Sequence, residues 1–540
     1  MKNKLLTTSA LLCCSIVALT GCKRKRSERE ITIRNMYFAS NEEIFEGTDP
    51  YTEFIEEKFD VEISPSYYNY SDWGSQVMGE INSVQTGETL PDVFHFDLES
   101  FNYGNTYKTW AEGGIIKALP DDLSKWPKVK QLIDNSSNIE SLKINGKLYG
   151  IPIAYDPFDP SKDFSSFTYI YRRDWVKLLD LQHCHDGVYD AGYPLLRDND
   201  EYTFEEFLNI IKAFGTRADI QDSKAAAIGD INWGFPSLTN FFKDSPHCYS
   251  VNNGVVSNAF TTEGYRRGLD ETVKLITAKL YYDQPSHTND EKAVEFYQGG
   301  HLGILYDNHS YGNYSKLRKT IKNVVPGISE ADLNDRTAFM KVYGIDDAYH
   351  LEGSENWFSM TFFNNDISDN KQKKVLDIME FLLSEEGTRL AIFGKENQDY
   401  VLVDGEPETL WEKKKNGEYP NIVNGAKFLR KMLTLGYDTT EYDPFTDQSS
   451  YQIVKNWDKD IAAKKAAGKL VTFQEPAKVK WLTTEKKDMY TSSMIKEGND
   501  TALNYCYGSG GITSWAKYTD ALSTAKWTET IAEINHVLGN

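Results

Sequence analysis

An alternation of strand and helix patterns near the N-terminus constrains the fold more than any other feature. Asp49 and Pro50 form a good helix start, since Asp caps the N-terminus and Pro suits the first turn. The expected elements, in order, are a strand at 31–38, a helix that places Tyr51, Phe54, Ile55 and Phe59 on one face, a strand at 61–64, a helix from Ser71 and a strand at 90–94. This order predicts a parallel sheet with right-handed crossovers, in which ligands sit beyond the carboxyl ends of the strands.

The middle of the chain continues the mixed pattern. Thr203 and Glu206 form a capping box before a helix. The later elements are a helix at 265–280, strands at 302–306 and 357–363, and a long helix from about 368 to 387. No linker rich in Pro, Gly or Ser divides the chain into independent domains. The sequence therefore predicts an α/β protein in which the parts fold together.

The first 22 residues are typical of an export signal. Lys2 and Lys4 precede an uncharged apolar stretch at 5–19, which is too short for a membrane span. The stretch ends in Leu-Thr-Gly-Cys, which resembles the lipobox of bacterial lipoproteins. We expect residues 1–21 to be a signal peptide, Cys22 to carry a diacylglycerol with acyl chains such as palmitate, and residues 22–29 to be the tether. The protein would then be held on the extracellular face of the cell membrane.

The charge of the chain argues against nucleic acid as a partner. The formal net charge is −21 for 540 residues, and it becomes −23 when Lys2 and Lys4 leave with the signal. A nucleic-acid-binding surface needs a basic stripe, whereas this balance suits a protein exposed outside the cell. The basic run at 23–26 is interpreted as a solvated tether, with contact to anionic lipid as the alternative.

Few residues offer catalytic or metal chemistry. After removal of the signal and lipidation of Cys22, three cysteines remain, which allow one bridge or three buried free thiols. The run at 183–186 holds two His, a Cys and an Asp, but adjacent residues rarely converge on one ion, so we expect no metal there. No phosphate-binding loop, dinucleotide fingerprint, zinc-protease motif or nucleophile elbow occurs. We expect no cofactor.

Short motifs over most of residues 30–400 resemble the extracellular solute-binding proteins of carbohydrate ABC importers, in the large lipoprotein branch of Gram-positive bacteria. In chain order they are the lipobox, Gly-Glu-Thr-Leu-Pro-Asp-Val at 87–93, Trp-Ala-Glu-Gly-Gly-Ile-Ile at 110–116, Asn-Gly-Lys-Leu-Tyr-Gly-Ile-Pro at 145–152, Tyr-Arg-Arg-Asp-Trp at 171–175, Thr-Phe-Glu-Glu-Phe at 203–207, Phe-Tyr-Gln-Gly-Gly-His-Leu-Gly at 296–303 and Ser-Glu-Glu-Gly at 384–387. Each motif alone is weak, but eight in the order of the family are a specific pattern.

The resemblance implies a type II fold like that of periplasmic binding proteins, with two discontinuous α/β lobes joined by a hinge. It places residues 30–153 and 286–348 in the first lobe, and residues 154–285 and 349–540 in the second. The calcium-loop region of the family corresponds to 217–224, which lacks the central glycine and enough oxygen ligands, so we expect no calcium there. The insertion at 183–199 has no assigned role.

A sugar site needs flat aromatic faces and planar polar groups that hydrogen-bond paired hydroxyls. Candidates lie after predicted strands or at expected lobe crossings, and they are Tyr37, Asp97, Tyr155, Asp156, Trp233, Asn308, Tyr311 and Trp357. Trp233 is the preferred stacking platform because polar loop residues flank it. Trp73 and Trp175 have apolar neighbours at helical spacing and are expected in the core.

The resemblance implies a binding protein and not an enzyme, acting as a monomer that delivers a carbohydrate to ABC permease subunits. Two alternatives stay open. One is an oligopeptide-binding lipoprotein, because peptide-binding relatives have similar length. The other is a surface glycoside hydrolase, which needs two carboxylates about 5 to 10 Å apart. The 80 acidic residues of the chain do not discriminate between these readings.

Overall fold

The computed structural model describes most of the chain after the N-terminal region. The described residues are 29–38, 50–68, 73–83, 90–98, 104–154, 167–185, 188–189, 196–197, 199–215, 226–230, 238–242, 248–281, 291–353, 355–411, 446–473 and 475–540. The predicted signal peptide at 1–21, Cys22 with all but the last residue of the predicted tether at 22–29, and the segment at 217–224 lie outside them.

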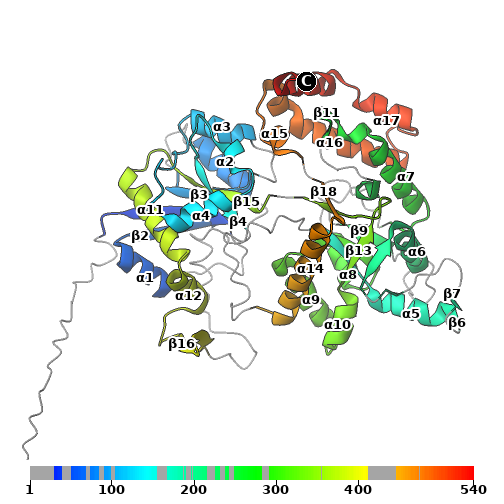
Figure 1. Cartoon of the computed structure of the whole chain (residues 1–540), viewed down its shortest axis with the longest axis horizontal. Helices are drawn as coiled ribbons and strands as arrows, with labels where there is room; N and C mark the ends of the chain where they lie inside the picture. The colour runs from blue at the N-terminus through cyan, green and yellow to red at the C-terminus, as the bar shows by residue number, and fades with distance from the viewer. Residues whose placement is uncertain are drawn as a thin grey trace, which may run out of the picture.

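A mixed sheet forms the first lobe, at the left of Figure 1, with the strand order β2-β1-β3-β15-β4. Its strands are β1 (Thr32–Phe38), β2 (Glu62–Tyr68), β3 (Val93–Phe96), β4 (Gly150–Ala154) and β15 (Trp357–Phe363). The predicted parallel pairing is confirmed for β1 with β2 and for β1 with β3. By contrast, β15 runs antiparallel to both β3 and β4, so the sheet is not parallel throughout.

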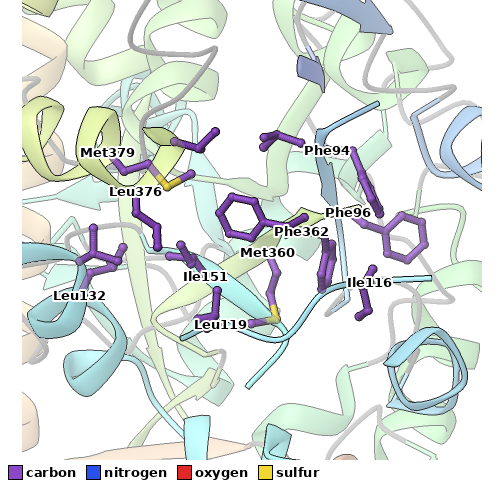
Figure 2. Packing of buried hydrophobic residues seen from close by; sticks show 14 of the residues in the cluster. Phe94, Phe96, Ile116, Leu119, Leu132, Ile151, Met360, Phe362, Leu376 and Met379 are labelled. Carbon is purple, nitrogen blue, oxygen red and sulfur yellow. The ribbon is translucent and has the colours of Figure 1, made fainter. Parts of the chain in front are cut away.

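Helices pack on both faces of this sheet. They are α1 (Pro50–Phe59), α2 (Trp73–Ser83), α3 (Gly104–Glu112), α4 (Pro127–Asn135), α11 (Asp369–Leu382) and α12 (Glu385–Phe393). Figure 2 shows the buried side chains between them, with Phe94, Phe96 and Phe362 on the sheet and Leu376 and Met379 on α11. On one face the rings of Phe96 and Trp110 meet edge to face at 4.9 Å. Alternating strand side chains thus supply two apolar layers.

The long helix predicted at 368–387 is two helices. α11 ends at Leu382, and α12 starts at Glu385 with Ser384 as its cap, where the Ser384 Oγ accepts from the Gly387 N–H at 3.1 Å. Gly387 also packs against the backbone of Phe381, and an added Cβ would lie 2.0 Å from the Phe381 carbonyl oxygen. The serine cap and the glycine permit the sharp turn, which the continuous hydrophobic pattern did not reveal.

A second sheet forms the other lobe, with the order β18-β14-β13-β5-β12-β9 and with β8 beside β13. Its strands are β5 (Phe167–Tyr171), β8 (Glu201–Thr203), β9 (Ala226–Asp230), β12 (Leu302–Asn308), β13 (Ala338–Tyr343), β14 (Tyr349–Glu352) and β18 (Leu470–Phe473). Its helices are α5 (Arg173–His183), α6 (Phe204–Gly215), α8 (Glu291–Gln298), α9 (Tyr311–Val324), α10 (Glu330–Arg336) and α14 (Gln448–Ala466). The capping box before α6 is confirmed, since the Thr203 N–H donates to Glu206 and the Glu206 N–H donates to the Thr203 Oγ1 at 3.2 Å.

The predicted lobe boundaries are wrong for several strands. Residues 286–348 were expected in the first lobe, yet β12 and β13 both pair with β5 of the second sheet. Residues 349–540 were expected in the second lobe, yet β15, α11 and α12 build the core of the first. The reason is that hydrophobic periodicity identifies a strand but not its partner, which lies far away in the sequence.

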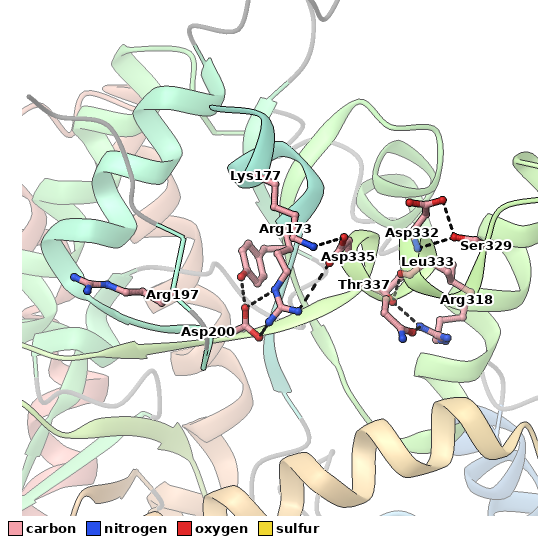
Figure 3. Close-up of polar contacts among 12 residues, drawn as sticks. Arg173, Lys177, Arg197, Asp200, Arg318, Ser329, Asp332, Leu333, Asp335 and Thr337 are labelled. Carbon is pink, nitrogen blue, oxygen red and sulfur yellow. Dashed lines mark hydrogen bonds and ion pairs between the residues drawn. The ribbon is translucent and has the colours of Figure 1, made fainter. Parts of the chain in front are cut away.

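Charged side chains connect the helices that pack on the second sheet (Figure 3). The Arg173 guanidinium pairs with Asp200 and reaches Asp335 at 3.9 Å, and the Lys177 ammonium lies 2.6 Å from the same Asp335. Nearby, the fully buried Arg318 donates to Asn334, Thr337, Glu330 and Ser449. These contacts follow the carboxyl end of β5 and therefore lie at the opposite end of that strand from Phe167.

A helical unit packs on the second lobe and has its own core (Figure 1). It consists of η6 (Ala259–Thr261), α7 (Glu263–Thr277), α15 (Ala477–Lys480), α16 (Glu485–Tyr507), α17 (Trp515–Leu522), α18 (Ala525–Leu538) and the hairpin β10–β11 (Tyr249–Asn252, Val255–Asn258). It is joined to the second lobe through η5 (Leu238–Phe242), whose Thr239 backbone contacts Gly268 of α7. Cys248 and Cys506 are buried free thiols of this core.

Three short elements complete the described secondary structure. η4 (Ile139–Leu142) follows α4, the hairpin β16–β17 (Tyr400–Val403, Glu406–Thr409) follows α12, and β6–β7 (Cys184–His185, Val188–Tyr189) falls in the insertion at 183–199. As expected, Trp175 is a core residue, since its ring packs edge to face on Phe214 at 5.2 Å. The side chain of Trp73 lies outside the description.

Candidate functional site

The topology places the candidate site at the carboxyl ends of the parallel strands. In the first sheet β1 has β2 on one side and β3 on the other, so the strand order switches direction between β1 and β3. Open α/β sheets bind ligands outside the carboxyl ends of the strands at such a switch point. Two predicted site residues fall there, because Tyr37 lies near the end of β1 and Asp97 directly follows β3.

Buried polar side chains continue from Asp97 across the first sheet. His95 lies opposite Thr361 of β15, and its Nδ1 is 3.0 Å from the Thr361 Oγ1. Ser359, two residues earlier on β15, is also buried, and its hydroxyl has no hydrogen-bond partner among the described residues. Side chains two apart on a strand share a face. His95, Asp97, Ser359 and Thr361 therefore form a polar stripe, which the sequence analysis recognised only at Asp97.

The second sheet presents its own strand ends where the chain crosses from the first lobe. β5 follows the crossover after β4 and runs antiparallel to β12, so Phe167 at its start lies opposite Asn308 at the end of β12. The Asn308 Oδ1 accepts from the Ser310 N–H at 2.8 Å and so forms the turn into α9. Its side-chain amide nitrogen, Nδ2, makes no hydrogen bond within the described part of the chain. This side chain therefore leaves a donor at the strand end.

Aromatic rings line the same face beside Asn308. Phe167 and Tyr306 stack with ring centroids 5.9 Å apart and 28° between their planes, and both are half-buried. The ring of Tyr169 packs against the ring of Tyr306, with centroids 4.8 Å apart, and connects Tyr306 to the core. Sequence reasoning missed this pair because β-branched and aromatic residues in a strand are ordinary core residues. Only strand pairing puts Phe167 and Tyr306 beside the amide of Asn308.

Tyr311, another predicted site residue, serves the scaffold in this structure. Its hydroxyl accepts from the Asp447 N–H at 2.7 Å, and its ring meets Tyr451 edge to face at 6.1 Å. These contacts tie the start of α9 to the start of α14. The neighbouring His309 is buried against Phe339 and Trp457.

Trp357 is fully buried where the chain returns from β14 to the first lobe. Its indole N–H donates to the Ser137 carbonyl at 3.0 Å, and its ring stacks on Trp481. With its ring covered by protein and its only donor used, Trp357 offers no surface to a ligand in this conformation. It is a structural residue of the crossing rather than a stacking platform.

Glu355, just before Trp357, was not singled out from the sequence. Its buried carboxylate accepts from the Ser137 Oγ, from the Asn138 Nδ2 at 2.9 Å and from the Trp481 Nε1 at 3.4 Å. The Lys480 ammonium lies 3.7 Å away. A buried carboxylate is tolerated only with such partners. In a chain with 80 acidic residues, no local pattern distinguishes this one.

The remaining predicted site residues lie beyond what can be described. They are Tyr155, Asp156 and Trp233, together with the side chain of Tyr37 and the lipidation site Cys22. Two described strands end shortly before three of these residues in the sequence. β4 ends at Ala154, which pairs with Trp357 and precedes Tyr155 and Asp156, and β9 ends at Asp230, before Trp233. Tyr155, Asp156 and Trp233 stay predictions.

A metal site and a membrane-spanning helix each have structural requirements that can be checked in the described residues. In them, no group of three or more His, Cys, Asp or Glu side chains could hold a metal ion. None of their helices has both the length and the apolar character that crossing a bilayer requires.

Solved structures similar to this chain include an alginate-binding protein, an ABC-transporter substrate-binding protein and a solute-binding protein. The alginate-binding protein AlgQ2, solved without calcium ion, is 14% identical, with 95% of this chain and 99% of that chain covered at a TM-score of 0.62. FusA of S. pneumoniae, an ABC-transporter substrate-binding protein in complex with kestose, is also 14% identical, with 94% and 99% covered at a TM-score of 0.62. An HMO-binding solute-binding protein from Bifidobacterium longum infantis is 14% identical, with 94% and 98% covered at a TM-score of 0.61.

These similarities lie in the structure, not in the sequence. No protein-family model matches the chain, and no curated protein matches it. At such low identity the comparison establishes the fold, which extends over nearly the whole of both chains. The predicted architecture is confirmed: this chain has the two-lobe α/β fold, with discontinuous lobes, of the ABC-transporter substrate-binding proteins.

Proposed function

We propose that this chain is the extracellular substrate-binding component of an ABC importer, and that it captures a carbohydrate between its two lobes. The observation that carries the proposal is the arrangement of the two sheets. The first ends in a stripe of buried polar side chains around Asp97, and the second ends in the Phe167–Tyr306 pair beside Asn308. Sugars need both kinds of surface, since C–H faces stack on rings and hydroxyls pair with carboxylate and amide groups.

The ligand class agrees with that of proteins sharing the fold. AlgQ2 binds alginate, FusA was solved with kestose, and a further S. pneumoniae protein of this fold takes part in N-glycan transport. We infer an oligosaccharide as the ligand, and a monosaccharide is the alternative, because a solute-binding protein of this fold from Thermotoga lettingae was solved with α-D-tagatose. The protein would act as a monomer without a cofactor and pass its ligand to permease subunits.

The binding role is proposed without bond cleavage. The carboxylates at the strand ends would accept hydrogen bonds from sugar hydroxyls and perform no proton transfer. Incubation of the purified protein with oligosaccharides checks this point. Steady product release in proportion to the protein concentration would instead identify a glycoside hydrolase.

Lipid anchoring through Cys22 completes the proposal. It rests on the apolar segment at 5–19 and the Leu-Thr-Gly-Cys sequence that ends it. Cells grown with labelled palmitate should incorporate label into the parent protein but not into the Cys22→Ala variant. Label in both proteins would rule out Cys22 as the anchor.

Calorimetric titration is the decisive test of the ligand class. We expect heat of binding from at least one member of a panel of neutral and acidic oligosaccharides, and none from short peptides. A micromolar ligand corresponds to about 8 kcal/mol. Peptide binding with no response to sugars would establish the oligopeptide-binding alternative and refute the carbohydrate proposal.

A further inference from the structure

The segment at 475–484, here named the strap, includes α15 of the helical unit and connects that unit to both lobes. It follows β18 of the second sheet and precedes α16 of the helical unit. Between these attachments its Trp481 packs into the hydrophobic core of the first lobe. The Thr483 Oγ1 also accepts from the Lys108 Nζ of α3 at 3.3 Å. The strap is thus a contact between lobes that is separate from the crossing between β14 and β15.

The strap and this crossing meet at one buried junction. The rings of Trp357 and Trp481 stack with centroids 5.6 Å apart and 22° between planes. Beside them, Glu355 is bound from the first lobe by Ser137 and Asn138, and from the strap by Trp481 and Lys480. The carboxylate loses favourable contacts if the strap moves away, and a buried charge without partners is costly. The junction therefore resists a change in the angle between the lobes.

The other side of the strap is held by the helical unit. Lys487 of α16 is buried, and its ammonium donates to the Lys480 carbonyl at 3.1 Å. Burial lowers the pKa of Lys487 from 10.5, against the opposing effect of the nearby Glu475 and Asp488 carboxylates. Because α16 belongs to the same core as α7, and α7 packs on η5, the strap is attached to the second lobe through the helical unit. The junction is therefore connected by packed side chains to both lobes.

We propose that Glu355, Trp357 and Trp481 form the pivot that sets the angle between the lobes, and that they control ligand affinity without touching the ligand. The inference rests on the proposed binding function. In it these are positioning residues, since each side chain is buried among other residues of the junction. Binding that needs both lobes depends on the fraction of molecules with the lobes suitably oriented.

Loosening the pivot should weaken binding through this fraction. The apparent Kd equals the intrinsic Kd divided by the fraction of binding-competent molecules, so a tenfold smaller fraction raises the Kd about tenfold. We expect Trp481→Ala to approach this change. Trp481→Phe keeps a stacking ring but loses the donor to Glu355, and Glu355→Gln keeps the shape but loses the charge facing Lys480. Both should raise the Kd less, by about threefold.

Distance measurements between labels test the pivot independently of any sugar. Nitroxide labels on a keto amino acid replace Glu53, which is exposed on α1 of the first lobe, and Val324, which is 54% exposed at the end of α9 of the second. Pulsed electron resonance on the full chain without ligand should give a broader distance distribution for Trp481→Ala than for the parent, and an intermediate one for Trp481→Phe and Glu355→Gln. The control is Trp126→Phe, which removes an indole donor to Asp377 within the first lobe.

The outcomes separate this inference from the proposed function. Broader distributions in the pivot variants but not in Trp126→Phe support the pivot even if no sugar binds, in which case the proposed function alone fails. Distributions as narrow as that of Trp126→Phe overturn the pivot, even if the parent binds an oligosaccharide. The conservative Trp481→Phe and Glu355→Gln variants keep the test valid if Trp481→Ala does not fold.

Discussion

The indole rings of Trp357 and Trp481 stack at 5.6 Å, although one belongs to the first sheet and the other to the strap that leaves the second. Trp357 was expected at the ligand because it starts a strand at a lobe crossing. The structure puts it at the crossing but surrounds it with protein, including the Ser137 carbonyl that accepts its N–H. A tryptophan at such a position can stabilise the contact between the lobes instead of binding the ligand.

Trp233 remains the preferred stacking platform. Replacing it with Ala should weaken sugar binding by roughly 1 to 2 kcal/mol because a stacking face is lost. The Tm of the empty protein should hardly change. Trp175→Ala is the contrast, since this ring packs in the core against Phe214, and its loss should cost about 3 to 5 kcal/mol of stability. Calorimetry and thermal unfolding measure both, and equal affinity of Trp233→Ala and parent would remove Trp233 from the site.

Ser359 tests the polar stripe of the first lobe. Its buried hydroxyl has no partner among the described residues, so Ser359→Ala should change the free energy of unfolding by less than about 1 kcal/mol. If the hydroxyl bonds the ligand, the same variant should bind sugar about fivefold to tenfold more weakly. Thr361→Val is the control for a hydroxyl that already has a partner, His95, and it should lower stability instead. Unchanged sugar affinity in Ser359→Ala would exclude Ser359 from ligand contact.

Arg318 should be important for the stability of the second lobe. Its guanidinium is fully buried and bonds four side chains, so Arg318→Met should lower the free energy of unfolding by about 1 to 3 kcal/mol, because the buried Thr337 hydroxyl loses a partner. Lys322 pairs with the same Glu330 at 2.5 Å but at the surface, so Lys322→Ala should lower it by less than about 1 kcal/mol. Denaturant unfolding measures both. Similar losses for the two variants would contradict the assigned role of burial.

Alkaline pH should destabilise the protein through its buried tyrosines. Burial raises the pKa of Tyr349 and of Tyr249 above 10.0. A folded-state pKa above the unfolded one contributes stability that is complete below pH 10 and is lost as the pH rises through the folded pKa. Denaturant unfolding between pH 8 and 11 should show this decline, and Tyr349→Phe should reduce its slope. A flat profile above pH 10 would refute the prediction.

Local patterns determined many of the helices and strands of both lobes. The strands at 31–38 and 357–363 and the capping box at Thr203 and Glu206 follow from period-two patterns and side-chain caps, which act over a few residues. Motif order additionally indicated the fold. The break between α11 and α12 was not predicted, because the hydrophobic pattern continues across Ser384.

Pairing between distant strands could not be predicted in the same way. β5 separates β12 from β13, which moves both into the second lobe, against the predicted boundaries. The same pairing brings Phe167 and Asn308 together. The return of the chain to β15 likewise places Thr361 beside His95. Each of these residues looks ordinary in its own segment.

The sequence by itself determined an α/β chain whose polar and aromatic residues follow predicted strands, and it predicted export, because hydrophobic period, caps and a signal-like N-terminus are local properties. Only the tertiary structure decided which lobe each strand joins, and that Glu355, Trp357 and Trp481 meet. The physical reason is that a buried carboxylate and two stacked rings are stabilised by groups from remote segments, and no local pattern records which segments will share a core.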